Sequence, residues 1–266
     1  MLPYPVIDPV AFPIGPLAVR WYSLAYLAGI LLGWWLIKKE LARKPIANLS
    51  SKAIDDIITW AVLGIVGGGR LGYVLFYKPA FYFANPALIF HVWEGGMSFH
   101  GGLIGTILAF YFFCRKYQVP FLELMDLLAF AAPIGLFFGR VANFINGELF
   151  GRVTDAAVGM VFPHGGDLPR HPSQLYEAGA EGLLLFLLLY ILLKYTTVRE
   201  KIGALSGVFL MGYAAARFGI EFFREPDAFL GFYLGFATMG QLLCTPMFFC
   251  GLYLVRKSHV ATQKSR

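Results

Sequence analysis

Residues 139–152 read GRVANFINGELFGR and follow directly on the apolar run FLELMDLLAFAAPIGLFF at 121–138. A run of this length and polarity is typical of a helix that lies in a membrane. The stretch after it places two arginines, two asparagines and a glutamate within fourteen residues. Polar side chains at membrane depth are costly and are retained mainly where they have a function. The two segments together predict a membrane helix that ends in a functional site.

The composition of the whole chain agrees with a membrane protein. Of its 266 residues 58% are hydrophobic and only 14% are charged, whereas soluble domains carry about 25% charged residues. The apolar segments are continuous and do not alternate, which favours helices over the strands of a membrane barrel. We therefore expect an all-α polytopic membrane protein with seven transmembrane helices, at about 22–37, 56–77, 98–114, 121–138, 175–193, 203–220 and 234–255.

The basic residues predict the orientation of these helices. Fourteen of the 22 lysines and arginines lie in the loops after the first, third, fifth and seventh apolar runs, against six on the other side. Because cytoplasmic loops carry the excess of Lys and Arg, the N-terminus is expected outside and the C-terminus in the cytoplasm. The net charge of +6 is explained by this topology, so it does not indicate a nucleic-acid partner. No linker or repeat divides the chain, and we expect a single transmembrane domain over residues 1–266.

The sixth apolar run carries a polar stripe. Tyr213, Arg217, Glu221 and Arg224 are spaced four, four and three residues apart, which places them on one helical face. One interpretation is an ion pair between Arg217 and Glu221 that only neutralises both charges. The other is an anion site, because two arginines for one glutamate leave positive charge that suits a lipid phosphate.

A second candidate precedes the third apolar run, where the sequence reads Ser98-Phe99-His100-Gly101-Gly102. Glycines let backbone or substrate approach closely, and a neutral imidazole there could act as a base or a hydrogen-bond donor. The alternative is a histidine that only caps or packs. Arg70, after three glycines in the second run, could pair with Glu94, Asp126 or another buried acid. Asp126 could cap the helix that it begins or pair with a cation at the cytoplasmic end.

The stretch at 139–152 leaves its own alternatives open. Asn143 and Asn146 could be turn formers, and Glu148 could compensate Arg140 or Arg152. For Arg140 a functional role is favoured, because it lies at the outer end of its run, at the level expected for Arg217. The three cysteines form no CxxC pair and the histidines show no ligand spacing, so we expect neither a metal nor another cofactor.

These segments resemble the bacterial prolipoprotein diacylglyceryl transferase family. Residues 139–151 match the signature G-R-x-x-N-F-x-N-x-E-x-x-G, and the segments at 70–77, 98–103 and 217–224 resemble other recurring segments of that family in the same order. The resemblance implies seven membrane helices with a small periplasmic head formed by the outside loops. It places the protein in the inner membrane, with the active site toward the periplasm.

The resemblance also implies a reaction. The family transfers the diacylglyceryl group of phosphatidylglycerol to the thiol of the lipobox cysteine in a preprolipoprotein signal peptide. The products are a thioether and glycerol 1-phosphate, and this is the first step of lipoprotein maturation.

Roles for individual residues follow from the resemblance as well. Arg140 and Arg217 match arginines that hold the lipid phosphate, and His100 matches the histidine proposed to help deprotonate the thiol. The positions expected to contact or shape the lipid site are Asn143, Asn146, Glu148, Gly151, Tyr22, Tyr213, Glu221 and Arg224.

Two other functions are compatible with the same arginines. A transporter or flippase for an anionic lipid would be indicated by inverted repeats or broken helices in both halves, and the sequence shows neither. A phospholipid phosphatase would need a second histidine with a paired acid near it.

Overall fold

A computed structural model describes residues 2–15, 17–226 and 237–264, and the chain forms two compact units. The larger unit comprises residues 1–37 and 125–266, and the smaller unit comprises residues 38–124. The predicted run at 234–255 falls partly outside the described residues. The single domain expected over residues 1–266 stays a prediction.

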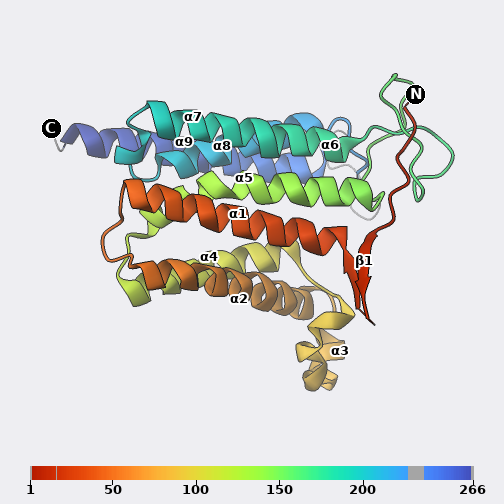
Figure 1. Cartoon of the computed structure of the whole chain (residues 1–266), viewed down its shortest axis with the longest axis horizontal. Helices are drawn as coiled ribbons and strands as arrows, with labels where there is room; N and C mark the ends of the chain where they lie inside the picture. Colours follow the sequence, from red (N-terminus) through yellow and green to blue (C-terminus); the bar gives the residue numbers. More distant parts are fainter. Residues whose placement is uncertain (1, 16, 227–236, 265–266) are drawn as a thin grey trace. The chain divides into compact units, whose positions relative to one another are not determined.

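The chain is mostly helical (Figure 1). A short hairpin of β1 (Val10–Ile14) and β2 (Leu17–Arg20) precedes the first long helix. The long helices are α1 (Trp21–Arg43), α2 (Ser51–Phe76), α4 (Phe99–Tyr117), α5 (Phe121–Ile145), α7 (Leu185–Tyr195), α8 (Ala204–Ile220) and α9 (Met239–Lys264). The shorter ones are α3 (Pro79–Ala84), η1 (Pro86–Phe90), η2 (Val92–Glu94), α6 (Ser173–Glu177), the π-helical η3 (Ala178–Leu184) and η4 (Val198–Glu200).

Each predicted apolar run is helical over most of its described residues, with non-helical positions only near the run ends. Within the described residues, three helices are long and apolar enough to cross a membrane: Lys52–Phe76, Phe121–Ile145 and Ser173–Tyr195. The apolar helix Ala204–Ile220 is shorter. These findings agree with a polytopic membrane protein, and the count of seven spans stays a prediction.

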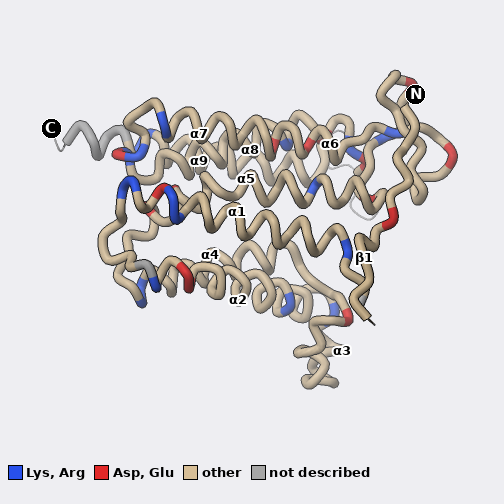
Figure 2. The backbone as a smooth tube through the Cα atoms, in the orientation of Figure 1, with Lys and Arg blue, Asp and Glu red and all other residues tan. Residues whose placement is uncertain are grey.

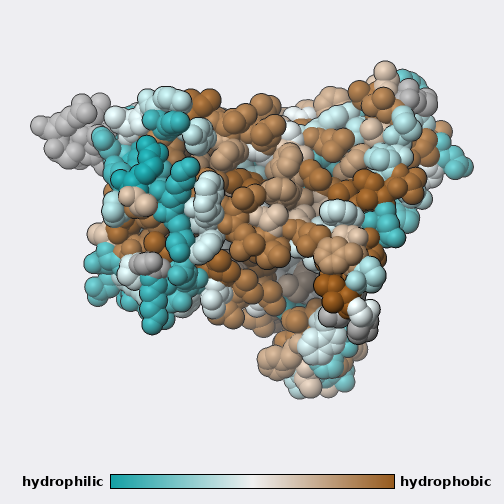
Figure 3. All heavy atoms as spheres, viewed as in Figure 1, coloured by the Kyte–Doolittle hydropathy of each residue, from teal (hydrophilic) through white to brown (hydrophobic). Residues whose placement is uncertain are grey.

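Charge and hydropathy are distributed as a bilayer requires. Figure 2 shows few charged residues along the middle of α1, α5 and α7, and basic residues stand in the last turns of α1 and α7, namely Arg43 and Lys194. Figure 3 shows apolar side chains over the helices and hydrophilic ones toward the helix ends. Leu63 and Ile104 are more than half exposed. Such apolar surface is suited to lipid and would be a liability in water.

The smaller unit is a helical pair that packs backbone against backbone. A Cβ atom added at Gly72 of α2 would lie 2.7 Å from the Cα of Gly101 in α4, and one at Gly105 would lie 2.6 Å from the Cα of Gly68. Glycine at these positions therefore permits a contact that no other residue allows. Ser98 begins α4, and its hydroxyl accepts the Gly101 N–H.

Arg70 organises the segment that joins α2 to α4. Its side chain is buried and donates to the carbonyl oxygens of Leu88 (2.6 Å), Ile89 (2.8 Å) and Gly95 (2.6 Å). The prediction of an acidic partner for Arg70 was wrong. Backbone carbonyls satisfy the guanidinium instead, because its planar fork of donors suits several acceptors at once.

Asp126, in the larger unit, was expected to cap the helix that it begins, but it lies within α5 and caps another helix. Its carboxylate accepts the N–H groups of Gly203 and Ser206 and the hydroxyl of Ser206, each at 2.7 Å. The helix so capped is α8, whose positive N-terminal end favours a carboxylate. The cap lies at the N-terminal end of α8, whereas Arg217 stands in the last turn of that helix.

Candidate active site

Three arginines converge on one buried carboxylate in the larger unit. Glu177 is fully buried, and its Oε1 accepts from Nη1 of Arg217 and from Nη1 of Arg224 at 2.9 Å. Its Oε2 lies 3.2 Å from Nε of Arg140. The three arginines come from the end of α5, from α8 and from the segment after α8. They retain 18%, 15% and 12% side-chain exposure for Arg140, Arg217 and Arg224.

Two further glutamates complete what we call the Arg–Glu cluster, which consists of Arg140, Arg217, Arg224, Glu177, Glu181 and Glu221. Glu181 is fully buried, and its Oε2 lies 3.6 Å from Nη2 of Arg140. Oε2 of Glu221 lies 2.9 Å from Nη2 of Arg217.

The ion pair between Arg217 and Glu221 was one of the two interpretations of the stripe, and it is confirmed. The other interpretation assumed a surplus of positive charge at the stripe. That assumption was wrong, since within the described residues three carboxylates face three guanidiniums.

A π-helical segment begins directly after Glu177 and contains Glu181. The chain is α-helical up to Glu177, π-helical from Ala178 to Leu184, and α-helical again from Leu185. Glu177 ends α6 and Glu181 lies in the π-helical segment, and both side chains contact Arg140. π-helical turns inside α-helices occur frequently at functional sites.

Sequence reasoning missed Glu177 and Glu181. A signal was present, because two acids four residues apart stand in the apolar run at 175–193. Acids within a membrane segment indicate a functional site by default. Attention to arginines alone left these two unassigned.

The end of the signature, residues 143–151, folds around Glu148, and we call this stretch the signature loop. Its Oε1 accepts from Nδ2 of Asn143 at 2.9 Å and from Nδ2 of Asn146 at 3.3 Å. Nε2 of Gln174 donates to the Glu148 carbonyl at 2.6 Å. The two asparagines thus do more than form a turn, because they orient the carboxylate of the signature.

Gly151 connects this loop to the segment that follows α8. Its N–H donates to the His171 carbonyl at 2.8 Å, and it forms an antiparallel bridge with Arg224. Nε of the neighbouring Arg152 donates to the Arg224 carbonyl at 2.8 Å. The loop therefore ties the position of Arg224 to the signature.

The two predicted tyrosines lie near the charged groups. Tyr22 is within electrostatic range of Glu148 and Arg140, and its hydroxyl lies 3.2 Å from that of Tyr26. Tyr213 is within the same range of Arg140, Arg217 and both Glu177 and Glu181. The structure thus brings together every predicted site residue of the larger unit.

His100 belongs to the smaller unit. It stands in the first turn of α4, is exposed, and its ring meets the edge of Phe99 at a centroid distance of 5.5 Å. Ser98, and not His100, supplies the helix cap. A role for His100 in the chemistry of the Arg–Glu cluster stays a prediction.

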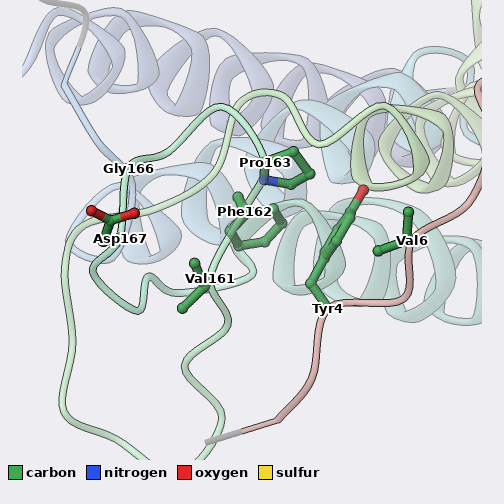
Figure 4. Close-up of a pocket in the computed structure, with 7 residues that line it drawn as sticks. All are labelled: Tyr4, Val6, Val161, Phe162, Pro163, Gly166 and Asp167. Carbon is green, nitrogen blue, oxygen red and sulfur yellow. The ribbon is translucent and has the colours of Figure 1, made fainter.

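A small head covers the end of α5 in the larger unit. Phe144, Met160 and Phe162 form its core, and the Tyr4 hydroxyl donates to the carbonyl of Phe144 at 2.7 Å. Figure 4 shows an open pocket in this head, of about 340 Å³. It is lined by Tyr4, Val6, Val161, Phe162, Pro163, Gly166 and Asp167. None of these is a predicted site residue.

Residues 2–15, 17–226 and 237–264 contain no group of three His, Cys, Asp or Glu side chains that could hold a metal ion. The described residues of the site are instead arginines, glutamates and amides, which suit the recognition of an anion.

Acid should destabilise the head through His171. Burial lowers the pKa of His171, whose ring packs on Phe223 and whose Nδ1 lies 3.1 Å from the Tyr176 hydroxyl. The unfolded chain binds this proton more readily, so the free energy of unfolding should fall as pH drops below about 6.5. In His171→Gln the fall should be smaller, because the group that takes up the proton on unfolding is absent.

Thermal unfolding in detergent between pH 5 and 8 measures the effect. The exposed His164→Gln is the control for loss of a histidine. An equal pH dependence in wild type and His171→Gln would contradict the assignment.

Comparison with known proteins identifies the family of this chain. Residues 9–256 match the family described as prolipoprotein diacylglyceryl transferase. A phosphatidylglycerol–prolipoprotein diacylglyceryl transferase of Paramagnetospirillum magneticum is 57% identical over 255 residues, covering 96% of this chain and 94% of the relative. Proteins of the same name from Rickettsia felis and Rhodospirillum rubrum are each 54% identical, covering 96% and 94% of this chain and 98% and 92% of the relatives. The chain therefore belongs to the prolipoprotein diacylglyceryl transferase family.

Proposed function

We propose that this protein transfers the diacylglyceryl group of phosphatidylglycerol to the lipobox cysteine of a preprolipoprotein. The relatives, which match nearly the full length of the chain, are named for the transfer of diacylglyceryl from phosphatidylglycerol to prolipoprotein. The observation that carries the proposal is the convergence of Arg140, Arg217 and Arg224 beside the family signature. No cofactor is needed for this reaction.

The reaction has two electrostatic requirements. The cysteine sulfur attacks the glyceryl carbon that bears the phosphate ester, a C–S bond forms, and the C–O bond to phosphate breaks. Free cysteine has a pKa of about 8.5, so a nearby base or cation must favour the thiolate. The electron pair of the broken bond stays on the departing glycerol phosphate, and the thiol proton balances its charge. Arginines stabilise that phosphate through charge-assisted hydrogen bonds in a site with little water.

The charge balance of the Arg–Glu cluster refines this role. With three glutamates beside three arginines, directed N–H donors, and not a surplus of charge, recognise the phosphate. Each guanidinium offers five N–H donors. Glu177 accepts one from Arg217 and one from Arg224 and forms an ion pair with Arg140. The remaining donors can form a fork around the phosphodiester.

The proposed setting is the inner membrane with the site on the periplasmic side. Arg140 stands at the C-terminal end of α5, while Arg43, Arg115 and Lys194 stand in the last turns of helices expected to end at the cytoplasm. Seven spans, an external N-terminus and a small head around residues 144–172 complete the proposed topology. The bilayer supplies one substrate and the signal peptide enters as the other.

We propose that His100 orients a lipid headgroup and is not the essential base for the thiol. Loss of a general base costs about 100-fold or more, whereas we expect His100→Asn to lose less, because stabilisation of the departing phosphate by arginine is the larger contribution. The measurement is the pH profile of kcat for His100→Asn beside wild type. A loss above about 100-fold together with a lost basic dependence would make His100 the base and contradict this expectation.

A transfer assay tests the function itself. Purified protein in detergent is incubated with phosphatidylglycerol and a lipobox peptide, and the peptide is analysed by mass spectrometry. A gain of one diacylglyceryl group on cysteine, with glycerol phosphate released, supports transfer. Diacylglycerol released without peptide would indicate hydrolysis. Lipid movement across vesicles without any product would indicate a flippase.

A further inference from the structure

The position of Glu177 is unusual for a site that receives an anion. A buried carboxylate repels a phosphate, and burial of a charge is costly unless the charge is paired. Glu177 is fully buried and has no water-facing surface. Its presence among the arginines therefore calls for a role that outweighs the repulsion.

The contacts of Glu177 differ from those of the other two glutamates. Glu181 contacts Arg140, and Glu221 contacts Arg217. Among the described residues, Glu177 alone links all three arginines of the Arg–Glu cluster, with Oε1 on two of them and Oε2 on the third. One rigid carboxylate thus fixes the spacing of guanidiniums that come from separate parts of the chain.

The backbone around Glu177 supports such a role. The residue lies at the junction of α6 with the π-helical segment, and the neighbouring Ser173 and Gln174 donate to the carbonyls of Leu149 and Glu148 at 3.0 and 2.6 Å. These two bonds tie α6 to the signature loop. The carboxylate is therefore held on both sides, by its own helix and by the arginines.

We propose that Glu177 is a positioning residue, which holds Arg140, Arg217 and Arg224 in the arrangement that grips the departing phosphate and does not itself touch the substrate. This inference rests on the proposed function. Its physical basis is that misplacement of a charged group by about 1 Å can cost up to about 100-fold in rate. A role in position predicts an effect on kcat, whereas a role in charge alone predicts an effect on lipid binding.

Two variants separate position from charge. Glu177→Gln keeps the shape and removes the charge, and Glu177→Asp keeps the charge and withdraws the carboxylate by one methylene. We expect kcat to fall about 30-fold in Glu177→Gln and about tenfold in Glu177→Asp. The KM for phosphatidylglycerol should change by less than about threefold in both, because the donors for lipid remain.

A variant of a second buried carboxylate serves as the control for a general loss of folding stability. Asp126→Asn removes a cap of α8 and should lower Tm, while kcat per folded molecule stays at the wild-type value. Size-exclusion chromatography and thermal unfolding at the assay temperature give the folded fraction. If Glu177→Gln does not fold, Glu177→Asp carries the test.

The outcomes distinguish this inference from the proposed function. If Glu177→Asp retains full kcat, or if the loss lies only in KM, Glu177 does not position the arginines. If Arg140→Ala and Arg217→Ala also retain turnover, the phosphate grip itself is wrong. Loss in the arginine variants with full activity in both Glu177 variants overturns the inference and leaves the function standing.

Discussion

Alanine at Arg140 or at Arg217 is expected to abolish diacylglyceryl transfer, with a loss of at least about 1,000-fold in kcat. Both guanidiniums contact Glu177, and both belong to the Arg–Glu cluster beside the signature. The departing phosphate would lose a charge-assisted donor at the moment its own charge develops. The transfer assay with purified variants measures the loss.

Folding must be separated from chemistry in this experiment. Removing Arg217 leaves Glu177 and Glu221 with less compensation, and breaking a buried pair costs about 3–5 kcal/mol. Arg217→Lys keeps the charge and loses the planar fork, so it should fold better and still transfer poorly. Arg43→Ala is the control that should keep wild-type activity, because Arg43 is exposed and its ion pair with Glu40 lies in the smaller unit, outside the Arg–Glu cluster. Near-normal turnover by Arg140→Ala or Arg217→Ala would remove the arginines from the mechanism.

Gly151→Ala is the second change with a large expected effect. An added Cβ would meet the Phe223 carbonyl and would lie 2.7 Å from the Cβ and 2.9 Å from the carbonyl oxygen of His171. Backbone atoms cannot move aside as a flexible side chain can, so the bridge to Arg224 must open. Overpacking of this kind costs about 1–3 kcal/mol and occasionally more.

We expect Gly151→Ala to lose about 100-fold in kcat, because the bridge that opens is the one that places Arg224. The measurement is transfer activity together with Tm in detergent. Gly135→Ala is the matched control, since nothing lies within 4 Å of a Cβ at that position in α5. Equal activity of Gly151→Ala and Gly135→Ala would show that the close approach has no role in the site.

The sequence predicted the helices and four of the six residues of the Arg–Glu cluster. Continuous apolar runs report burial in lipid directly, so the helices coincide with them. Arg217 and Glu221 are four residues apart on one helix, and such local pairs can be recognised from spacing alone. The approach of Glu177 to Arg140 and Arg217 depends on packing between helices, which spacing does not encode.

Two other errors have the same origin. Arg70 was expected to need an acid, but the carbonyls of residues 88–96 satisfy it once the connecting segment folds over α2. The excess of positive charge expected near Arg217 was counted along one helix, whereas Glu177 and Glu181 are supplied by another. Long-range contacts of polar groups decide both cases, and hydrophobic periodicity carries no information about them.

The equal number of arginines and glutamates in the Arg–Glu cluster has a consequence for how the site can evolve. Because Glu177 compensates three arginines, loss of one charge harms the others, and the effect of a substitution depends on which partner charges remain. The effects of substitutions at these six positions are therefore not additive, so selection at one position depends on the residues at the others. For folding stability, the loss of a glutamate together with an arginine should cost less than the sum of the two single losses.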